Sequence, residues 1–520
     1  MAQLARVRPR GRRLVYPRRM RFLLAVAFAA TLSAAPLRFE ITLDPAIAPH
    51  GASGRLLVFL ADAKQPREVL NGGFIPGETW IAAREVEYIG PGATIVFDPD
   101  VNAYPKPFSQ APAGDYEFMA LLDPDHTYAR SAQDGGDLYS AVVTVRGINP
   151  ADASEPVKLT ISKLTPVKPK PADTENVKLV EFVSPTLSKF WGRPITMRAG
   201  VVLPPDYAKS AKQYPAVYMV HGFGGDHTAA WSAGNAIAKD IAEGKRFPSV
   251  HVFLDASFPT GHHVFADSLN NGPWGKALTE EFIPYLEKTF RLIPKTSARF
   301  LTGHSSGGWS TLWLEVNYPD VFGGTWSTSP DPVDLHSFTG VDVTPGSTQN
   351  MYVNKSGAPL NLVRMDGKEL ASFEQFSRAE QVQGEYGGQI ASFEWVWSPK
   401  GADGRPMKIF NRETGEQNPD VQKAWEKYDI RKIMESNWPT LGPKLLGKLH
   451  LVVGSEDTFH LEEATIMLCG FLKSKGREDV CEVVPGRDHM NLYQPYKTYP
   501  EGLSMRIDHE IQAAFEKGNK

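Results

Sequence analysis

The stretch Arg299-Phe300-Leu301-Thr302-Gly303-His304-Ser305-Ser306-Gly307-Gly308-Trp309 decides the fold of this chain. An apolar, strand-like run opens it, and helix-compatible residues follow Gly308. Between them stands the pattern Gly-X-Ser-X-Gly, centred on Ser305. A sharp turn from strand to helix places a serine hydroxyl at the carboxyl end of a parallel sheet, where ligands of open α/β sheets bind. We therefore expect Ser305 to be a catalytic nucleophile.

A glycine-rich turn follows an earlier apolar strand. Ala216–Val220 leads directly into His221-Gly222-Phe223-Gly224-Gly225. Small residues allow the backbone to approach a substrate carbonyl closely, and the second N–H of an oxyanion hole comes from such a loop. We expect the backbone N–H groups of Ser306 and Phe223 to stabilise an oxyanion, with Gly224 as the alternative to Phe223.

A serine nucleophile needs a base, and the base needs a carboxylate that orients it. In sheets of this type the chain order is serine, then acid, then histidine. The apolar strand Leu449–Val453 ends in a turn that carries Glu456 and Asp457, and His489 follows a later strand. The sequence therefore predicts Asp457 as the acid and His489 as the base.

Several residues near these motifs remain alternatives. Glu456 is the second choice for the acid, and Asp331 and Asp334 follow the next strand after the serine, where an acid could also lie. Four side chains are candidates for lining a substrate site, namely His221, His304, His460 and Trp274. No group of His, Asp and Cys has the spacing of metal ligands, so we expect neither a metal nor another cofactor.

The chain divides into two parts around a linker. Short alternating strands with turn residues between them predict a β-sandwich, Ig-like, over residues 36–164. Residues 165–177 alternate Pro and Lys, which favours an extended linker. Residues 178–520 alternate apolar strands with helices and predict an α/β fold with a mostly parallel sheet. This alternation of strands and helices is absent over about 341–440, which indicates an insertion near the site of Ser305.

The N-terminal residues have the pattern of a targeting segment. Arginines precede the apolar run Phe22–Ala30, and small residues follow it, so 1–35 is predicted to be a secretory signal peptide, with Met20 as an alternative start. The run is shorter than the roughly 20 residues of a membrane span. We expect an exported protein, periplasmic or extracellular, without a membrane span once the signal is removed.

Composition gives weaker guidance. A formal net charge of −3 with 22% charged residues gives no reason to expect nucleic acid as a partner. The two cysteines, Cys469 and Cys481, could form a disulfide worth roughly 3 kcal/mol or remain buried thiols, and the sequence favours neither. Nothing in it indicates an oligomeric state.

Taken together, these residues resemble the putative-esterase family of α/β-hydrolases, which includes feruloyl, acetylxylan and enterochelin esterases, S-formylglutathione hydrolase and mycolyltransferases. The resemblance covers about Val180 to Phe515 and rests on the serine motif and on Val202-Leu203-Pro204-Pro205-Asp206-Tyr207, Val220-His221-Gly222, Asn271-Gly272-Pro273-Trp274, Ile283-Pro284-Tyr285, Gly454-Ser455-Glu456-Asp457 and Asp488-His489. Ser306 departs from it, because many relatives carry Met there.

This resemblance implies an α/β-hydrolase sheet and a serine carboxylic ester hydrolase that forms an acyl-enzyme. The substrates it implies are small-molecule, carbohydrate or siderophore-type esters. Three alternatives stay open: an acyltransferase with the same acyl-enzyme, a peptidase with the same three residues, and a binding protein without activity. Because the insertion is longer than in small family members, no particular substrate carries over.

Overall fold

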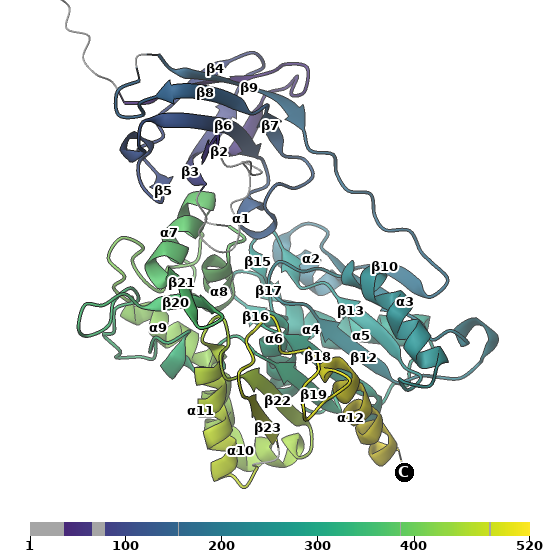
Figure 1. The fold of residues 1–520 in the computed structure, drawn as a ribbon. Coiled ribbons are helices and arrows are strands. Elements are labelled where there is room, and N and C mark those ends of the chain that lie inside the picture. Colours follow the sequence, from purple (N-terminus) through teal and green to yellow (C-terminus); the bar gives the residue numbers. More distant parts are fainter. Residues whose placement is uncertain (1–35, 65–78, 154, 385, 478–479, 520) are drawn as a thin grey trace, which may run out of the picture.

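A computed structural model describes residues 36–519 of this protein, apart from 65–78, 154, 385 and 478–479. The segment expected to be a signal peptide, 1–35, lies outside the described residues. Within the described part, no helix is both long enough and apolar enough to span a bilayer. Two large sheets dominate the molecule, one from each half of the expected domain division (Figure 1).

The N-terminal sheet joins nine strands in the order β4-β1-β9-β7-β6-β2-β3-β5, with β8 also paired to β6. β6 pairs with β2, β7 and β8, so hydrogen bonds connect all strands in one bent sheet. The Ig-like sandwich of two separate sheets that was expected over residues 36–164 is therefore not confirmed. The strand bounds are β1 Phe39–Leu43, β2 Ala52–Asp62, β3 Trp80–Ile89, β4 Thr94–Phe97, β5 Ala103–Tyr104, β6 Gly114–Asp123, β7 Leu138–Ser140, β8 Val143–Ile148 and β9 Val157–Leu164.

β3 has a mixed apolar and charged sequence. Arg84, Glu85 and Glu87 interrupt its apolar pattern, and this strand pairs along one edge of β2. β9 ends at Leu164 and β10 begins at Val177, with neither helix nor strand between them. We propose that this extended stretch is the linker between two domains.

The second sheet has the expected α/β character. Its eight strands follow the order β10-β11-β13-β12-β18-β19-β22-β23. The pairings of β10 with β11 and of β11 with β13 are antiparallel, and the others are parallel, so the expected mostly parallel sheet is confirmed. The bounds are β10 Val177–Val183, β11 Thr196–Val202, β12 Ala216–Val220, β13 Val250–Leu254, β18 Arg299–His304, β19 Gly324–Thr328, β22 Leu449–Gly454 and β23 Cys481–Val484.

Helices connect these strands and cover the sheet. Every residue of the helix that follows β18, except its last, is buried, which is why its sequence lacks a polar face. A disulfide joins Cys469 in α11 to Cys481 at the start of β23. The helix bounds are α2 Pro185–Trp191, α3 Ala229–Ala242, α4 Trp274–Ala277, α5 Ile283–Thr289, α6 Ser306–Asn317, α11 Leu461–Ser474 and α12 Leu503–Gly518.

The insertion between β19 and β22 has regular structure of its own. It contains β20 Asn361–Met365, β21 Lys368–Ser372, α7 Phe373–Gln383, α8 Gln389–Trp397, α9 Pro419–Trp425 and α10 Ile430–Leu441. Its aromatic residues share a core with α6, where Trp397 packs against Trp309 at a ring-centroid distance of 5.3 Å. The insertion is therefore part of the α/β core rather than a separate unit.

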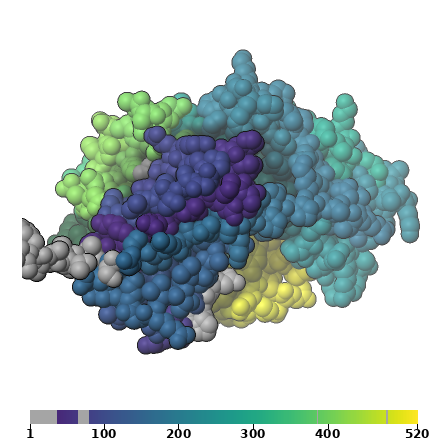
Figure 2. Space-filling model, turned by 90° about the horizontal axis from the view of Figure 1, so that it is seen from above, coloured from purple at the N-terminus to yellow at the C-terminus, as the bar shows by residue number. Residues whose placement is uncertain are grey.

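The N-terminal sheet lies against the insertion. Ala379 and Val382 of α7 share an apolar cluster with residues of the N-terminal sheet such as Leu57 and Phe59. Seen from above, the purple and blue N-terminal residues adjoin the green residues of the insertion (Figure 2). The two parts of the chain thus meet at α7.

Candidate active site

Ser305 stands in a strained turn between β18 and α6. Its backbone has φ 61° and ψ −128°, a conformation that costs free energy for a residue with a side chain. Three backbone hydrogen bonds hold it: its N–H donates to the carbonyl of Thr328 at 3.0 Å, and its own carbonyl accepts from the N–H of Trp309 at 3.0 Å and of Asp331 at 3.3 Å. A Cβ at Gly307 would clash with the carbonyl oxygen of Val220 in β12, so only glycine fits there.

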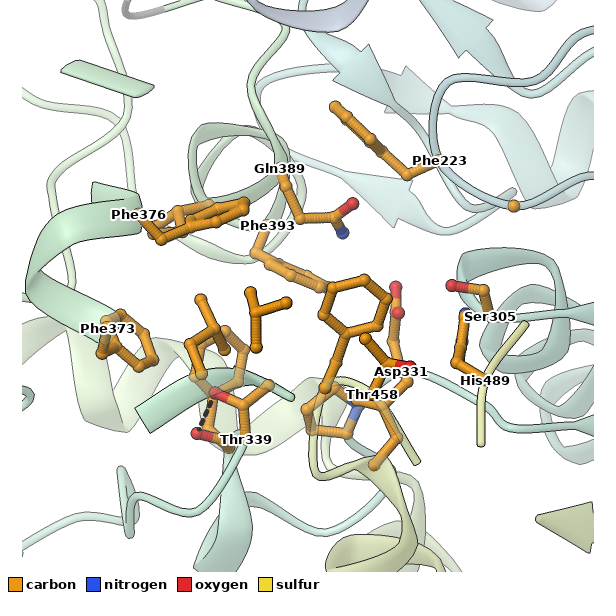
Figure 3. A pocket seen from close by; sticks show the side chains of 18 of the residues that line it. Phe223, Ser305, Asp331, Thr339, Phe373, Phe376, Gln389, Phe393, Thr458 and His489 are labelled. Carbon is orange, nitrogen blue, oxygen red and sulfur yellow. Dashed lines mark hydrogen bonds between the residues drawn. The ribbon is translucent and has the colours of Figure 1, made fainter. Parts of the chain in front are cut away.

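His489 and Asp457 form a buried pair beside this turn. Asp457 follows β22 and His489 follows β23, and the Nδ1 of His489 donates to the Oδ2 of Asp457 at 2.9 Å. Their exposed fractions are 6% for His489 and 0% for Asp457. Because Nδ1 carries the hydrogen in this arrangement, Nε2 of a neutral imidazole is left to accept a proton. Figure 3 shows His489 next to Ser305.

The pair shifts the pKa of both partners. Burial alone raises the pKa of Asp457, but the charge and hydrogen bond of His489 and the N–H of Phe459 bring it below its usual value. Burial lowers the pKa of His489, but the charge and hydrogen bond of Asp457, together with the charges of Asp331 and Asp488, bring it above its usual value. Asp457 is therefore ionised at neutral pH and stabilises a protonated His489.

His304 supports His489 from the other side. Its Nε2 donates to the backbone carbonyl of His489 at 3.1 Å, and its ring lies 4.3 Å from the His489 ring, centroid to centroid. Burial lowers the pKa of His304 to about 3, so it stays neutral, and its Nδ1 accepts from the hydroxyl of Thr328 at 3.0 Å. His304 also lines a cavity that opens next to Ser305.

The glycine-rich turn after β12 lies directly against the serine. A Cβ placed on Gly222 would sit 3.2 Å from the Cβ of Ser305 and 3.7 Å from its Oγ, so glycine leaves space beside the hydroxyl. Ser306 is the first residue of α6, and its N–H therefore has no acceptor one turn earlier in the helix. Phe223 lines the same cavity. These are the positions from which two N–H groups could bind an oxyanion.

The other acid candidates are placed differently. Glu456 is exposed and lies 4.0 Å from Arg364. Asp334 pairs with His336 at 2.7 Å and with Arg431 at 3.4 Å. Asp331 lines the cavity, and its carboxyl group forms no hydrogen bond with His489 within the described part of the chain. Only Asp457, of these described carboxylates, contacts the His489 ring nitrogen.

An apolar cavity of about 370 Å³ opens next to Ser305 (Figure 3). Most of its apolar lining comes from the insertion and from the loop before α11 rather than from the strand ends that the sequence analysis singled out. The sequence reasoning missed these residues, because they are spread over more than one hundred positions without periodicity. The apolar lining comprises Phe223, Pro332, Phe338, Leu362, Val363, Met365, Phe373, Phe376, Ile390, Phe393, Phe459, Leu461 and Met490.

Three of the four candidate lining residues do not lie among those that line the cavity. His221 is engaged by the backbone: its Nδ1 donates to the carbonyl of Gly222, and its Nε2 accepts from the N–H of Ala256. Trp274 is buried and stacks on His263 at 3.7 Å. His460 stands at the start of α11, outside the cavity. Of these four candidates, only His304 lines the cavity.

Two groups of described residues bring together atoms of the kind that bind metals. They are Asp334 with His336 and Asp429, and His460 with Glu462 and Glu463. Each group already has cationic or N–H partners, since Arg431 contacts Asp334 and Arg364 contacts Glu462. Neither group includes a residue that lines the catalytic cavity.

The sheet and the serine turn place this chain in the class of α/β-hydrolase-like proteins. Residues 191–434 match the family described as "Putative esterase", so the resemblance inferred from the sequence is confirmed. The matched region includes Ser305 and ends before Asp457 and His489.

Curated relatives and solved structures carry esterase names. The chain is 30% identical over 161 residues to an endo-1,4-beta-xylanase/feruloyl esterase of Xylanibacter ruminicola, covering 28% of this chain and 20% of that one. It is 29% identical over 164 residues to an esterase of Mycobacterium tuberculosis, covering 31% and 33%. The chain thus spans between a fifth and a third of the length of these relatives.

Similar solved structures include a ferulic acid esterase, with a TM-score of 0.39 and 14% identity over 60% of this chain and 91% of that chain. They also include an S-formylglutathione hydrolase of Staphylococcus aureus, with a TM-score of 0.37 and 14% identity over 65% and 98%.

Proposed function

We propose that this protein is a serine carboxylic ester hydrolase with Ser305 as nucleophile, His489 as base and Asp457 as orienting acid. One observation carries the proposal: a serine in a strained strand-to-helix turn lines the same cavity as a histidine whose other ring nitrogen is bound by a buried carboxylate. The esterase family match and the names of the relatives support the reaction class.

In the proposed reaction, Nε2 of His489 takes the proton from Oγ of Ser305 as that oxygen attacks the ester carbonyl carbon. The N–H groups of Ser306 and Phe223, or Gly224 in place of Phe223, stabilise the oxyanion. The protonated His489 then gives its proton to the departing alcohol. Water, deprotonated by His489, releases the acid and restores Ser305.

The cavity supports an ester with one apolar group of moderate size. Aromatic and aliphatic side chains line most of it, and burial of apolar area favours binding by roughly 25 cal/mol per Å². Because relatives are named feruloyl esterase, esters of aromatic acids with carbohydrate alcohols are the first substrates to test. Siderophore-type esters form the second set.

Replacing the nucleophile tests the proposal. Ser305→Ala should lower kcat/KM for p-nitrophenyl butanoate by about four to six orders of magnitude and abolish labelling by a fluorophosphonate. Ser356→Ala, in an exposed turn of the insertion, is the matched control and should behave like the wild type. A Ser305→Ala protein that keeps its activity would refute the assignment.

We also propose that the protein is exported and that residues 36–164 form a β-sandwich domain. The Cys469–Cys481 disulfide supports export, because disulfides persist in oxidising compartments. The signal-peptide pattern of residues 1–35 supports it independently. Fractionation of cells that express the full chain would test this, and a cytosolic, uncleaved product would contradict it.

A further inference from the structure

The catalytic cavity contains a carboxyl group that the proposed reaction does not use. Asp331 follows β19, is only 4% exposed and lines the cavity. Its backbone N–H donates to the carbonyl of Ser305 at 3.3 Å, which fixes it beside the nucleophile. In Figure 3 its carboxyl group lies between Ser305 and the apolar side chains of the cavity.

Within the described residues, no ion pair neutralises this carboxyl group, although the charge of a protonated His489 acts on it. Its Oδ2 is buried and has no hydrogen-bond partner, and no Lys, Arg or His forms an ion pair with it. Among the described lining residues it is the only carboxylate, in a cavity that is otherwise largely apolar. A buried carboxylate without a partner is costly, so a partner supplied by the substrate would account for its presence.

The surrounding groups set the charge of Asp331. Burial raises the pKa of Asp331 to about 6, against the lowering effects of Ser306 and of the charge on His489. It is therefore largely ionised at neutral pH. An ionised carboxylate near Ser305 would repel the oxyanion that forms during attack, unless a hydrogen-bond donor or a cation lies against it.

We propose that Asp331 determines specificity by binding a hydrogen-bond donor, either a hydroxyl or an ammonium group, that the ester carries close to its scissile carbonyl. This inference rests on the proposed function of Ser305. Asp331 accepts a hydrogen bond from the substrate and takes no part in the proton transfer from Ser305 to His489. The apolar remainder of the substrate then fills the cavity beyond Asp331.

Matched esters test the inference. One arm compares benzyl butanoate with benzyl 2-hydroxybutanoate and benzyl 2-aminobutanoate, which carry the donor on the acyl group. A second arm compares propyl butanoate with 2-hydroxyethyl and 2-aminoethyl butanoate, which carry it on the alcohol. In one of the two arms, the wild type should have a higher kcat/KM for the donor-bearing esters than for the unsubstituted ester. The arm that shows this preference tells whether the acyl group or the alcohol of the ester contacts Asp331.

Two variants separate the two donors. Asp331→Asn should lower the preference for the ammonium ester at least about tenfold, since hydrogen bonds to charged groups are the strong ones, while a preference for the hydroxyl ester remains. Asp331→Leu should abolish both preferences. In both variants kcat/KM for the unsubstituted ester should rise, because the repulsion of the oxyanion is removed. Asp334→Asn, in the same loop but outside the cavity, should keep the wild-type ratios.

Three outcomes would overturn the inference. Preferences unchanged in both variants would show that Asp331 binds no substrate group. If kcat/KM fell equally for all esters in variants that thermal unfolding shows to be correctly folded, Asp331 would instead be a residue that positions His489. A wild-type protein that cleaves no ester would refute the proposed function itself, whereas active wild type with unchanged ratios would refute only this inference.

Discussion

At the scale of single residues, the hydrogen bond between Asp457 and His489 helps to set the pKa of the proposed base. Burial lowers the pKa of His489 and the Asp457 carboxylate raises it above its usual value. Asp457→Asn removes that increase, so the pKa of His489 should fall. Because the proposed mechanism needs neutral His489, the acid limb of the pH profile of kcat/KM should move to lower pH. The plateau should drop by about 10³- to 10⁴-fold, as an amide orients the imidazole poorly.

The runner-up acid provides the control for this prediction. Glu456→Gln alters an exposed carboxylate next to Asp457 in the chain and leaves the His489 contact intact. Its pH profile should match that of the wild type. If Glu456→Gln shifted the acid limb and Asp457→Asn did not, the roles of the two residues would be reversed.

Residues differ in how far they can be predicted from sequence. Ser305 could be found because its strand, turn and helix are contiguous. Asp457 and Asp331 both follow a strand end, and only the folded distance shows that Asp457 is the one bound to His489. The apolar lining could not be predicted, since residues such as Phe338 and Phe459 come together only through the insertion.

At the scale of elements, the turn between β18 and α6 depends on the close approach of α6 to β12. Gly307→Ala would force its new methyl group against the carbonyl of Val220. We expect this to lower the free energy of unfolding by about 1–3 kcal/mol or more, as overpacking does, and to move Ser305 out of position. Thermal unfolding and kcat/KM measured on the same preparation would check both effects.

The chain offers a matched glycine as control. Gly470 lies on the exposed face of α11, and a Cβ there meets no atom within 4 Å. Gly470→Ala should leave activity unchanged and stabilise the protein by roughly 0.5–1 kcal/mol, the usual difference between these residues in a helix. Equal melting temperatures for the two variants would contradict the close packing of α6 on β12.

The sheet of the α/β part could be predicted better than the N-terminal sheet. Strands such as β12 and β13 are buried on both faces and read as continuous apolar runs, and the predicted bounds of β12 coincide with the observed ones. β3 carries charged residues on its exposed face, so its sequence is not a continuous apolar run. The sequence showed the insertion only as a region without the alternation of strands and helices. Its short strands and helices could not be predicted, because their pairing and packing depend on residues distant in the sequence.

At the scale of the whole molecule, the N-terminal sheet holds one wall of the catalytic cavity through Arg55. This buried side chain of β2 donates to the carbonyls of Gln381 and Val382 at the end of α7, at 2.8–3.2 Å, and to Glu85 at 2.9 Å. Cationic groups stabilise the carboxyl end of a helix. The same helix carries Phe373 and Phe376, which line the cavity.

Arg55→Ala should therefore impair binding of large substrates in particular. Phe373 and Phe376 lie on the side of the cavity away from Ser305 (Figure 3), so a short acetyl ester should not reach them. Loss of charge-assisted hydrogen bonds worth about 1.5–3 kcal/mol should raise KM for a long-chain p-nitrophenyl ester about tenfold, with kcat little changed. The KM for p-nitrophenyl acetate should stay near the wild-type value.

Arg84→Ala is the matched control, because Arg84 is exposed on the neighbouring strand and donates to Val96 within the N-terminal sheet. It should leave both KM values unchanged. An Arg55→Ala protein with the same KM as the wild type for both esters would show that α7 keeps its place without the N-terminal sheet. A rise limited to the long-chain ester would instead mean that the N-terminal sheet, which makes no contribution to the Ser305–His489–Asp457 group, still determines which esters the cavity accepts.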